Sequence, residues 1–189
     1  MLTLTETGSK TMTTLGEVAE RVDDFSKDCH DELIPVEKIT FNHLESMNIG
    51  SKAHYLRPAA QMEIAFRVGI PLHYLRKCPT SLQCDNMNHW MLQERNEDLF
   101  VRFDGNEVRA VFTRKYKPVD NHELISRLAE LGYGEDTKVQ CHLDPEFMLL
   151  NIPDVGRSFE IVKGDHMMPG ISVSNSEVGL SSVTVAAYI

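Results

Sequence analysis

The chain has 189 residues, of which 42% are hydrophobic and 25% charged, and its formal net charge is −9. These values are typical of a globular protein, and the length favours one well-buried core over two. The negative balance argues against a protein that coats nucleic acid over its whole surface, although one local basic patch is compatible with it.

Residues 1–12 are rich in Thr and unpatterned, so we expect a flexible N-terminal tail before a single domain over residues 13–189. The N-terminus has no basic stretch followed by an apolar run, which argues against a secretory signal. No window approaches the roughly 18 apolar residues of a membrane span. We therefore expect a cytoplasmic protein without a membrane partner.

The first half of the chain predicts mainly helices. Thr14 and Glu17 form a capping box before a helix with an apolar stripe. That stripe consists of Leu15, Val18, Val22 and Phe25. A short strand is expected over residues 36–41, followed by helices over residues 59–68, 72–76 and 81–94.

Residues 98–117 predict a β-hairpin around a two-residue loop, Gly105-Asn106. In this register Asp104 faces Glu107, and Arg102 faces Arg109 on the exposed side. The residues expected on the buried face are Leu99, Val101, Phe103, Val108, Ala110 and Phe112.

A helix capped by Asp120 is expected after the hairpin, with an apolar stripe of Leu124, Ile125, Leu128 and Leu131. Strands are expected over residues 138–143, 147–152, 159–163, 171–174 and 182–189. This order predicts an α+β fold, in which a helical N-terminal part precedes a mostly antiparallel sheet with a packed helix. The last residues, VTVAAYI, form an apolar run without a polar end, so we expect the domain to be truncated at its C-terminus.

Positive charge concentrates around the hairpin, where residues 99–117 sum to +3 while the rest of the chain sums to −12. Arg102 and Arg109 are candidates for nucleic-acid contact, and the competing interpretation is that Asp104 and Glu107 neutralise them on the exposed face. The remaining cations, Arg114, Lys115 and Lys117, surround Tyr116. This pattern suits single-stranded nucleic acid, because phosphates meet the cations while a base stacks on the ring. Alternatively, Tyr116 closes the core and the basic residues keep an edge strand soluble.

The densest uncharged polar cluster surrounds residues 174–177. Asn175, Ser176 and Glu177 are candidates for a ligand-contact loop. The other interpretation is a turn in which Asn and Ser side chains bond the backbone.

The four cysteines are irregularly spaced and are expected to be free thiols. Cys78, Cys84 and His89 come nearest to a metal set, but five residues separate the two cysteines, where zinc sites use two to four. No phosphate-binding loop or Gly-x-Ser-x-Gly elbow is present. We therefore expect no metal, no cofactor and no catalytic residue.

Three segments of the chain carry a resemblance: VRFDGNEVRAVFTRKYKPVDNHEL, GISVSNSEVGLSSVTVAAYI, and GIPLHYLRKCP with the following Asn88-His89-Trp90. Together they resemble a family of phage- and plasmid-associated proteins that is catalogued only as a domain of unknown function. The resemblance covers roughly residues 60–189. In that family the last segment continues into a strand with an Arg and a Cys-Thr-Asn-Gly-like motif, which again points to truncation. The resemblance implies a mobile-element setting and no established activity.

The sequence thus predicts a non-enzymatic accessory protein of a phage or plasmid that contacts single-stranded nucleic acid. The alternative is a protein-interaction or assembly module without a nucleic-acid role, and an enzyme ranks third. The steep salt dependence of phosphate binding separates the first two hypotheses.

Overall fold

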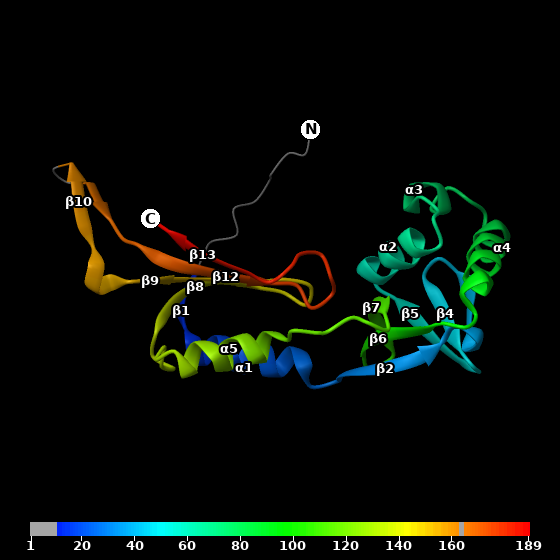
Figure 1. Ribbon diagram of the computed structural model, residues 1–189, viewed down its shortest axis with the longest axis horizontal. Helices are drawn as coiled ribbons and strands as arrows, with labels where there is room; N and C mark the ends of the chain where they lie inside the picture. Colours follow the sequence, from blue (N-terminus) through cyan, green and yellow to red (C-terminus); the bar gives the residue numbers. More distant parts are fainter. Residues whose placement is uncertain (1–10, 163–164) are drawn as a thin grey trace. The chain divides into compact units, whose positions relative to one another are not determined.

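The computed structural model describes residues 11–162 and 165–189, which belong to two compact units (Figure 1). Unit 1 combines the chain up to Phe25 with Pro118–Ile189, and unit 2 is the continuous stretch Ser26–Lys117. Unit 2 is therefore inserted into the sequence of unit 1. The length of the chain had instead led us to expect a single domain. Most of the expected tail, residues 1–10, lies outside the described residues, and Thr11 and Met12 belong to the first strand.

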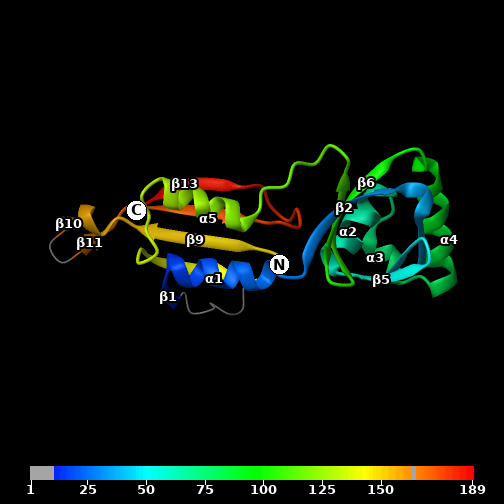
Figure 2. The ribbon, with the colours of Figure 1, turned by 90° about the horizontal axis from the view of Figure 1, so that it is seen from below.

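Unit 1 is built on a five-stranded antiparallel sheet in the order β1-β8-β9-β12-β13. Its strands are β1 (Thr11–Thr14), β8 (Lys138–Leu143), β9 (Met148–Pro153), β12 (Gly170–Asn175) and β13 (Thr184–Tyr188). Helices α1 (Leu15–Ser26) and α5 (Asn121–Glu130) lie side by side on one face of this sheet (Figure 2). A 3₁₀ turn, η3 (Val155–Arg157), precedes a separate hairpin of β10 (Phe159–Val162) and β11 (Asp165–Met167).

The core of unit 1 confirms most of the two predicted helical stripes. Its helical members are Leu15, Val18, Val22, Ile125 and Leu128, and they pack against buried strand residues such as Leu150. Two stripe residues were predicted wrongly, because Phe25 is 43% and Leu131 is 74% exposed. Both lie where their helices end, so the chain turns before either side chain reaches the sheet.

The capping box of α1 is confirmed atom by atom. The backbone N–H of Thr14 donates to Oε2 of Glu17 at 3.0 Å, and the N–H of Glu17 donates to Oγ1 of Thr14 at 3.2 Å. Two amide groups that the first turn leaves without helical partners are thereby satisfied.

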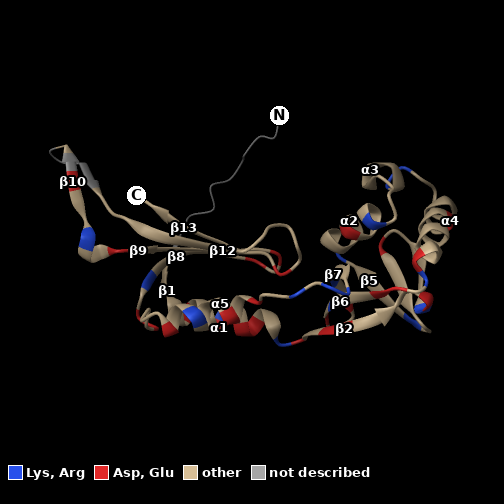
Figure 3. Cartoon of the chain, viewed as in Figure 1, with Lys and Arg blue, Asp and Glu red and all other residues tan. Residues whose placement is uncertain are grey.

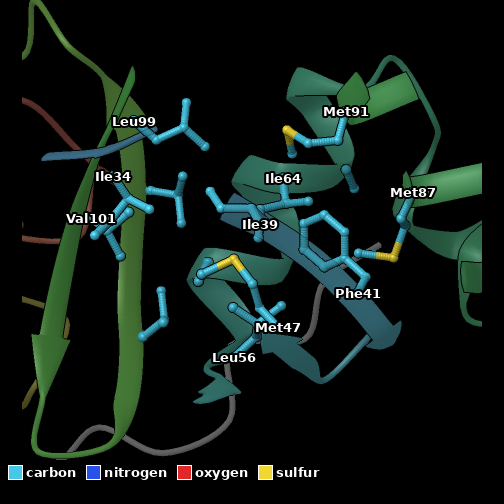
Figure 4. Close-up of a cluster of buried hydrophobic side chains, with 14 of the residues drawn as sticks. Ile34, Ile39, Phe41, Met47, Leu56, Ile64, Met87, Met91, Leu99 and Val101 are labelled. Carbon is cyan, nitrogen blue, oxygen red and sulfur yellow. The ribbon is translucent and has the colours of Figure 1, made fainter. Parts of the chain in front are cut away.

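Unit 2 is a six-stranded sheet in the order β2-β6-β7-β5-β4-β3, with helices over one face. The strands are β2 (Cys29–Pro35), β3 (Ile39–His43), β4 (Ser46–Ile49), β5 (Lys52–Leu56), β6 (Asp98–Asp104) and β7 (Glu107–Thr113). The helices are α2 (Pro58–Arg67), α3 (Leu72–Leu75) and α4 (Thr80–Met91), with 3₁₀ turns η1 (Val36–Lys38) and η2 (Leu92–Glu94). Figure 4 shows Ile64 and Met91 from the helices meeting Ile39 and Leu99 from the strands in its core.

The fold is α+β, as predicted, but the order of its parts differs from the prediction. A strand comes first, and the sheet of unit 2 occupies the region where mainly helices were expected. Segments such as CHDELIP and SMNI lack the alternation of apolar and polar residues that marks a strand, so their pairing is set by the neighbouring strands. The structure places no helix long and apolar enough to cross a membrane within residues 11–162 and 165–189.

The β6–β7 hairpin has the predicted loop, but the pairing of its two strands departs from the predicted register a few residues beyond the loop. Asp104 pairs with Glu107, as expected, whereas Arg102 pairs with Ala110 because Arg109 is the extra residue of a β-bulge. A one-residue shift moves side chains to the other face of the sheet. Val111 therefore joins the core, and Phe112, which was expected there, is only partly buried on the second face.

Candidate functional site

A cavity of about 560 Å³ lies between α2 and the end of β7, within unit 2. We call it the α2–β7 cavity. Its lining residues are Met62, Glu63, Phe66 and Arg67 from α2, and Val111, Phe112, Thr113, Lys115 and Tyr116 from β7 and the segment after it. Mainly apolar walls with a few polar groups, at a volume of roughly 300–1,000 Å³, are typical of small-ligand sites.

The cavity forms because β7 continues beyond the point where its neighbouring strand, β5, ends. The parallel strand β5 pairs with β7 only at Glu107 and Val108, so α2 meets the edge of β7 beyond that point. There the backbone N–H of Val111 donates to Oε2 of Glu63 at 2.6 Å. The carboxyl group of a helix residue thus takes the place of a strand partner.

The pKa of Glu63, one of the residues that line the cavity, is strongly shifted from its usual value. Burial raises its pKa to about 8, and the hydrogen bond from Val111 opposes that shift only in part. The side chain is therefore mostly protonated at neutral pH. A carboxyl group perturbed by desolvation inside a cavity is typical of functional sites.

Aromatic rings form one wall and the rim. Tyr116 stacks on Phe112 with ring centroids 3.8 Å apart and an interplanar angle of 13°. It also lies 5.6 Å from the ring of Phe100, so this tyrosine is held in an aromatic cluster. Phe66, by contrast, is 88% exposed at the rim. The ring best placed to stack on a ligand is therefore Phe66, rather than Tyr116 as the sequence suggested.

Three of the predicted cations are exposed in the segment after β7, and one of them lines the cavity. Lys115 lines it and, within the described part of the chain, has no ion-pair partner. Arg114 lies near Asp98, with Nη1 and Oδ2 3.6 Å apart, and Lys117 is exposed. Arg67 is bound instead to Glu94, with Nε and Oε2 2.5 Å apart in an ion pair whose angles are not those of a hydrogen bond.

The expectation that Arg102 and Arg109 lie on an exposed face is wrong. They are 4% and 5% exposed, respectively. Nε of Arg102 donates to Oδ1 of Asp31 at 2.9 Å, and Nη1 of Arg109 lies 3.0 Å from the sulfur of Cys29. The carboxylates expected to neutralise them, on Asp104 and Glu107, both bind Arg57 instead. The two arginines therefore stabilise the sheet and are no longer candidates for nucleic-acid contact.

The cluster of Asn175, Ser176 and Glu177 is engaged in holding unit 1 together. Nδ2 of Asn175 donates to Oδ1 of Asn121 at 3.0 Å, and Oγ of Ser176 donates to the carbonyl of Glu146 at 2.7 Å. Oε1 of Glu177 accepts the backbone N–H of Asn121 at 2.7 Å, so it caps α5 where Asp120 was expected to do so. These bonds favour the interpretation as a structural turn.

All four cysteines are free thiols. Among the described residues, no three His, Cys, Asp or Glu side chains gather where they could hold a metal ion. Cys84, one of the nearest candidates, donates its thiol to the carbonyl of Asn42. The sequence spacing of Cys78, Cys84 and His89 thus has no counterpart in a convergent site.

The two units differ strongly in charge. Unit 2 has 13 Lys and Arg against 12 Asp and Glu, a net charge of +1, whereas unit 1 has 6 against 16, a net charge of −10. In Figure 3 the positions of acidic residues are coloured red along α1 and α5 of unit 1. The acidity of the chain is therefore carried by unit 1, and the unit with the α2–β7 cavity is nearly neutral.

The sequence analysis identified neither Glu63 nor Phe66 as a candidate, although α2 carries a signal for Phe66. Ile64 and Ala65 are buried in the core, while Met62 and Phe66, four positions apart, share another side of the helix. A short helix that is apolar on two sides has more apolar surface than one core contact can bury.

A second cavity, of about 570 Å³, lies in unit 1 beside Pro153 and Gly170. Its charged lining residues, Asp154 and Arg157, are exposed and bind each other, with Oδ2 and Nε 3.3 Å apart. Neither of them is a half-buried carboxyl group like that of Glu63. The α2–β7 cavity is therefore the stronger candidate.

Comparison with known proteins does not extend this description. No protein-family model, curated protein or solved structure matches the chain.

Proposed function

We propose that unit 2 contacts single-stranded nucleic acid, in a non-enzymatic role, through the α2–β7 cavity and the basic segment of residues 114–117. The observation that carries this proposal is the pairing of an exposed aromatic ring, Phe66, with a cation, Lys115, on one apolar cavity. Proteins that bind single strands combine cations for the phosphates with rings on which bases stack.

The distribution of charge supports the proposal. Arg114, Lys115 and Lys117 are exposed and lie within four residues of the chain. The unit that carries them has a net charge of +1, so its own field does not repel a polyanion. The mobile-element setting implied by the family resemblance is compatible with such a role.

A second candidate function is binding of a partner protein. Met62 and Phe66 are 44% and 88% exposed beside mainly apolar walls, and an apolar side chain of a partner would fill the cavity well. Exposed apolar surface of this kind marks interaction sites of several classes. In this case the basic segment would add little to the affinity.

Titration of the full chain into a fluorescently labelled single-stranded oligonucleotide, followed by anisotropy at several salt concentrations, tests the proposal. Lys115→Ala should weaken binding for all sequences and reduce the salt slope by about one phosphate. Phe66→Ala should cost roughly 1–3 kcal/mol of binding free energy while leaving the slope unchanged.

Lys38→Ala is the matched control, since Lys38 is an exposed lysine of η1 in the same unit and does not line the cavity. Its affinity and salt slope should equal those of the unsubstituted chain. Absence of binding at low salt would overturn the nucleic-acid proposal and favour the partner-protein function.

A further inference from the structure

We infer that the α2–β7 cavity selects guanine among the nucleobases, through two hydrogen bonds from the base to the carboxyl group of Glu63. This inference rests on the proposed function and adds a base specificity to it. It follows from how Glu63 is held, from which base edges can bind a carboxylate, and from the charges around the cavity.

The carboxyl group of Glu63 is fixed in one orientation with acceptor capacity left over. Its Oε2 accepts the N–H of Val111 at 2.6 Å, while its Oε1 has no hydrogen-bond partner in the described structure. Each carboxylate oxygen has two acceptor positions. One position on Oε2 and both on Oε1 are therefore left for a ligand in the cavity.

Guanine is the base whose edge matches this group. A carboxylate accepts hydrogen bonds and donates none, so it needs neighbouring donors on its ligand. Guanine presents two adjacent donors, the ring N1–H and the exocyclic N2–H₂. Adenine and cytosine place an acceptor nitrogen beside their amino group, and thymine has a single N–H between two carbonyl oxygens. Each of these three bases therefore sets a lone pair against an oxygen of the carboxylate.

Binding of guanine would be coupled to release of a proton. Burial keeps Glu63 mostly protonated in the empty cavity, with a pKa of about 8. Two donors from the base stabilise the ionised form, so the carboxylic acid gives its proton to solvent as the base binds. The base supplies hydrogen bonds only and remains chemically unchanged. Affinity for guanine should therefore rise with pH up to the pKa of Glu63.

Two cations line the cavity together with Glu63. Lys115 is one of them, and it has no ion-pair partner within the described residues. Arg67 also lines the cavity, but its charge is already balanced by Glu94. The tyrosine in the wall, Tyr116, contributes its ring through the stack on Phe112. Phe66 at the rim completes the site by covering a face of the base.

The test uses the full chain and short labelled thymidine oligonucleotides whose central position is dG, dA, dC or dT. Anisotropy titrations at low salt and about pH 8.5 should show the dG oligonucleotide bound roughly tenfold more tightly than the others, as for one good bidentate base contact. The preference should shrink at about pH 6.5, where Glu63 holds its proton.

Glu63→Gln is the decisive variant, because its amide has nearly the same shape but presents an N–H₂ group to the donors of guanine. It should lose the preference for dG, whereas Glu37→Gln, an exposed carboxyl change in the same unit, should keep it. Thermal unfolding followed by the fluorescence of the single tryptophan, Trp90 in α4, verifies that unit 2 of each variant is folded.

The outcomes separate the inference from the proposed function. If oligonucleotides bind but dG is not preferred, or if Glu63→Gln keeps the preference, the guanine inference is overturned and the nucleic-acid function stands. If no oligonucleotide binds, both fail. A preference for dA or dC that survives in Glu63→Gln would show that the neutral carboxyl group reads the base, and would also overturn the inference.

Discussion

At the scale of single residues, Glu63 lines the candidate site and is expected to lower the free energy of unfolding of unit 2. Its side chain is half-buried beside mainly apolar walls, and the hydrogen bond from Val111 replaces only part of the water that is lost. Because the ionised form is disfavoured in the folded chain, the stability of unit 2 should depend on pH through this residue.

The sign of that dependence follows from the two pKa values. The folded pKa of about 8 lies above the unfolded value of 4.5, so the folded state binds more protons between them. The free energy of unfolding should therefore fall as pH rises through this window, by at most about 1.4 kcal/mol per pH unit. Glu63→Gln removes the titration, so its stability advantage over the unsubstituted chain should grow with pH. Denaturant unfolding at several pH values, followed by Trp90 fluorescence, measures this, and a pH-independent difference would contradict it.

Gly170 is a residue whose missing side chain matters. A Cβ at this position would lie 2.5 Å from the carbonyl oxygen of Ile152 and 2.5 Å from the ring of Tyr188. Gly170→Ala should therefore destabilise unit 1 by roughly 1–3 kcal/mol, as overpacking usually does. Gly134→Ala is the matched control, since nothing lies within 4 Å of a Cβ there. Thermal unfolding followed by circular dichroism compares the two, and equal melting temperatures would refute the close packing.

At the scale of elements, the bulge in the β6–β7 hairpin decides which aromatic ring supports the core. Phe103, ahead of the register shift, is 2% exposed, whereas Phe112 lies beyond it in the wall of the α2–β7 cavity. Phe103→Ala should cost roughly 3–5 kcal/mol of unfolding free energy. Phe112→Ala should cost less than half as much, because only its stack on Tyr116 and part of its burial are lost. Chemical denaturation of both variants tests the bulge. Equal losses of unfolding free energy would favour the register without a bulge, in which both rings face the core.

At the scale of the whole molecule, the two units carry very different net charges, and this difference bears on the proposed contact with a polyanion. Unit 1, at −10, opposes the contact that unit 2, at +1, is proposed to make. The negative charge of the full chain should therefore weaken binding to nucleic acid over distances of about one Debye length, roughly 10 Å at 0.1 M salt.

A polypeptide of residues 26–117 should bind single strands more tightly than the full chain at low salt. It keeps a complete hydrophobic cluster of its own and the whole α2–β7 cavity, and it loses the acidic unit. The difference should vanish as salt screens the charges. Circular dichroism establishes whether the polypeptide folds, and anisotropy measures its affinity. A folded polypeptide that binds more weakly than the full chain would show that unit 1 takes part in binding.

The sequence by itself determined the features that neighbouring residues specify. The capping box of Thr14 and Glu17, the Gly105-Asn106 turn and the ends of β8 were all predicted correctly, because each depends on chemistry within a few residues. Residues 115 and 116 line the cavity and belong to the basic cluster that is visible in the sequence, and their contact with nucleic acid stays a prediction.

Only the tertiary structure decided which distant segments meet. The pairing of Thr11–Thr14 with residues 138–141 makes unit 1 discontinuous, and no local pattern encodes a strand partner so far along the chain. Arg102 and Arg109, two predicted surface cations, are buried because they contact Asp31 and Cys29 of β2, a strand whose sequence has no strand pattern of its own. Glu63 and Phe66 line the candidate site because β5 ends early and leaves the edge of β7 to α2. Burial and charge at that cavity depend on this packing, which local sequence does not specify.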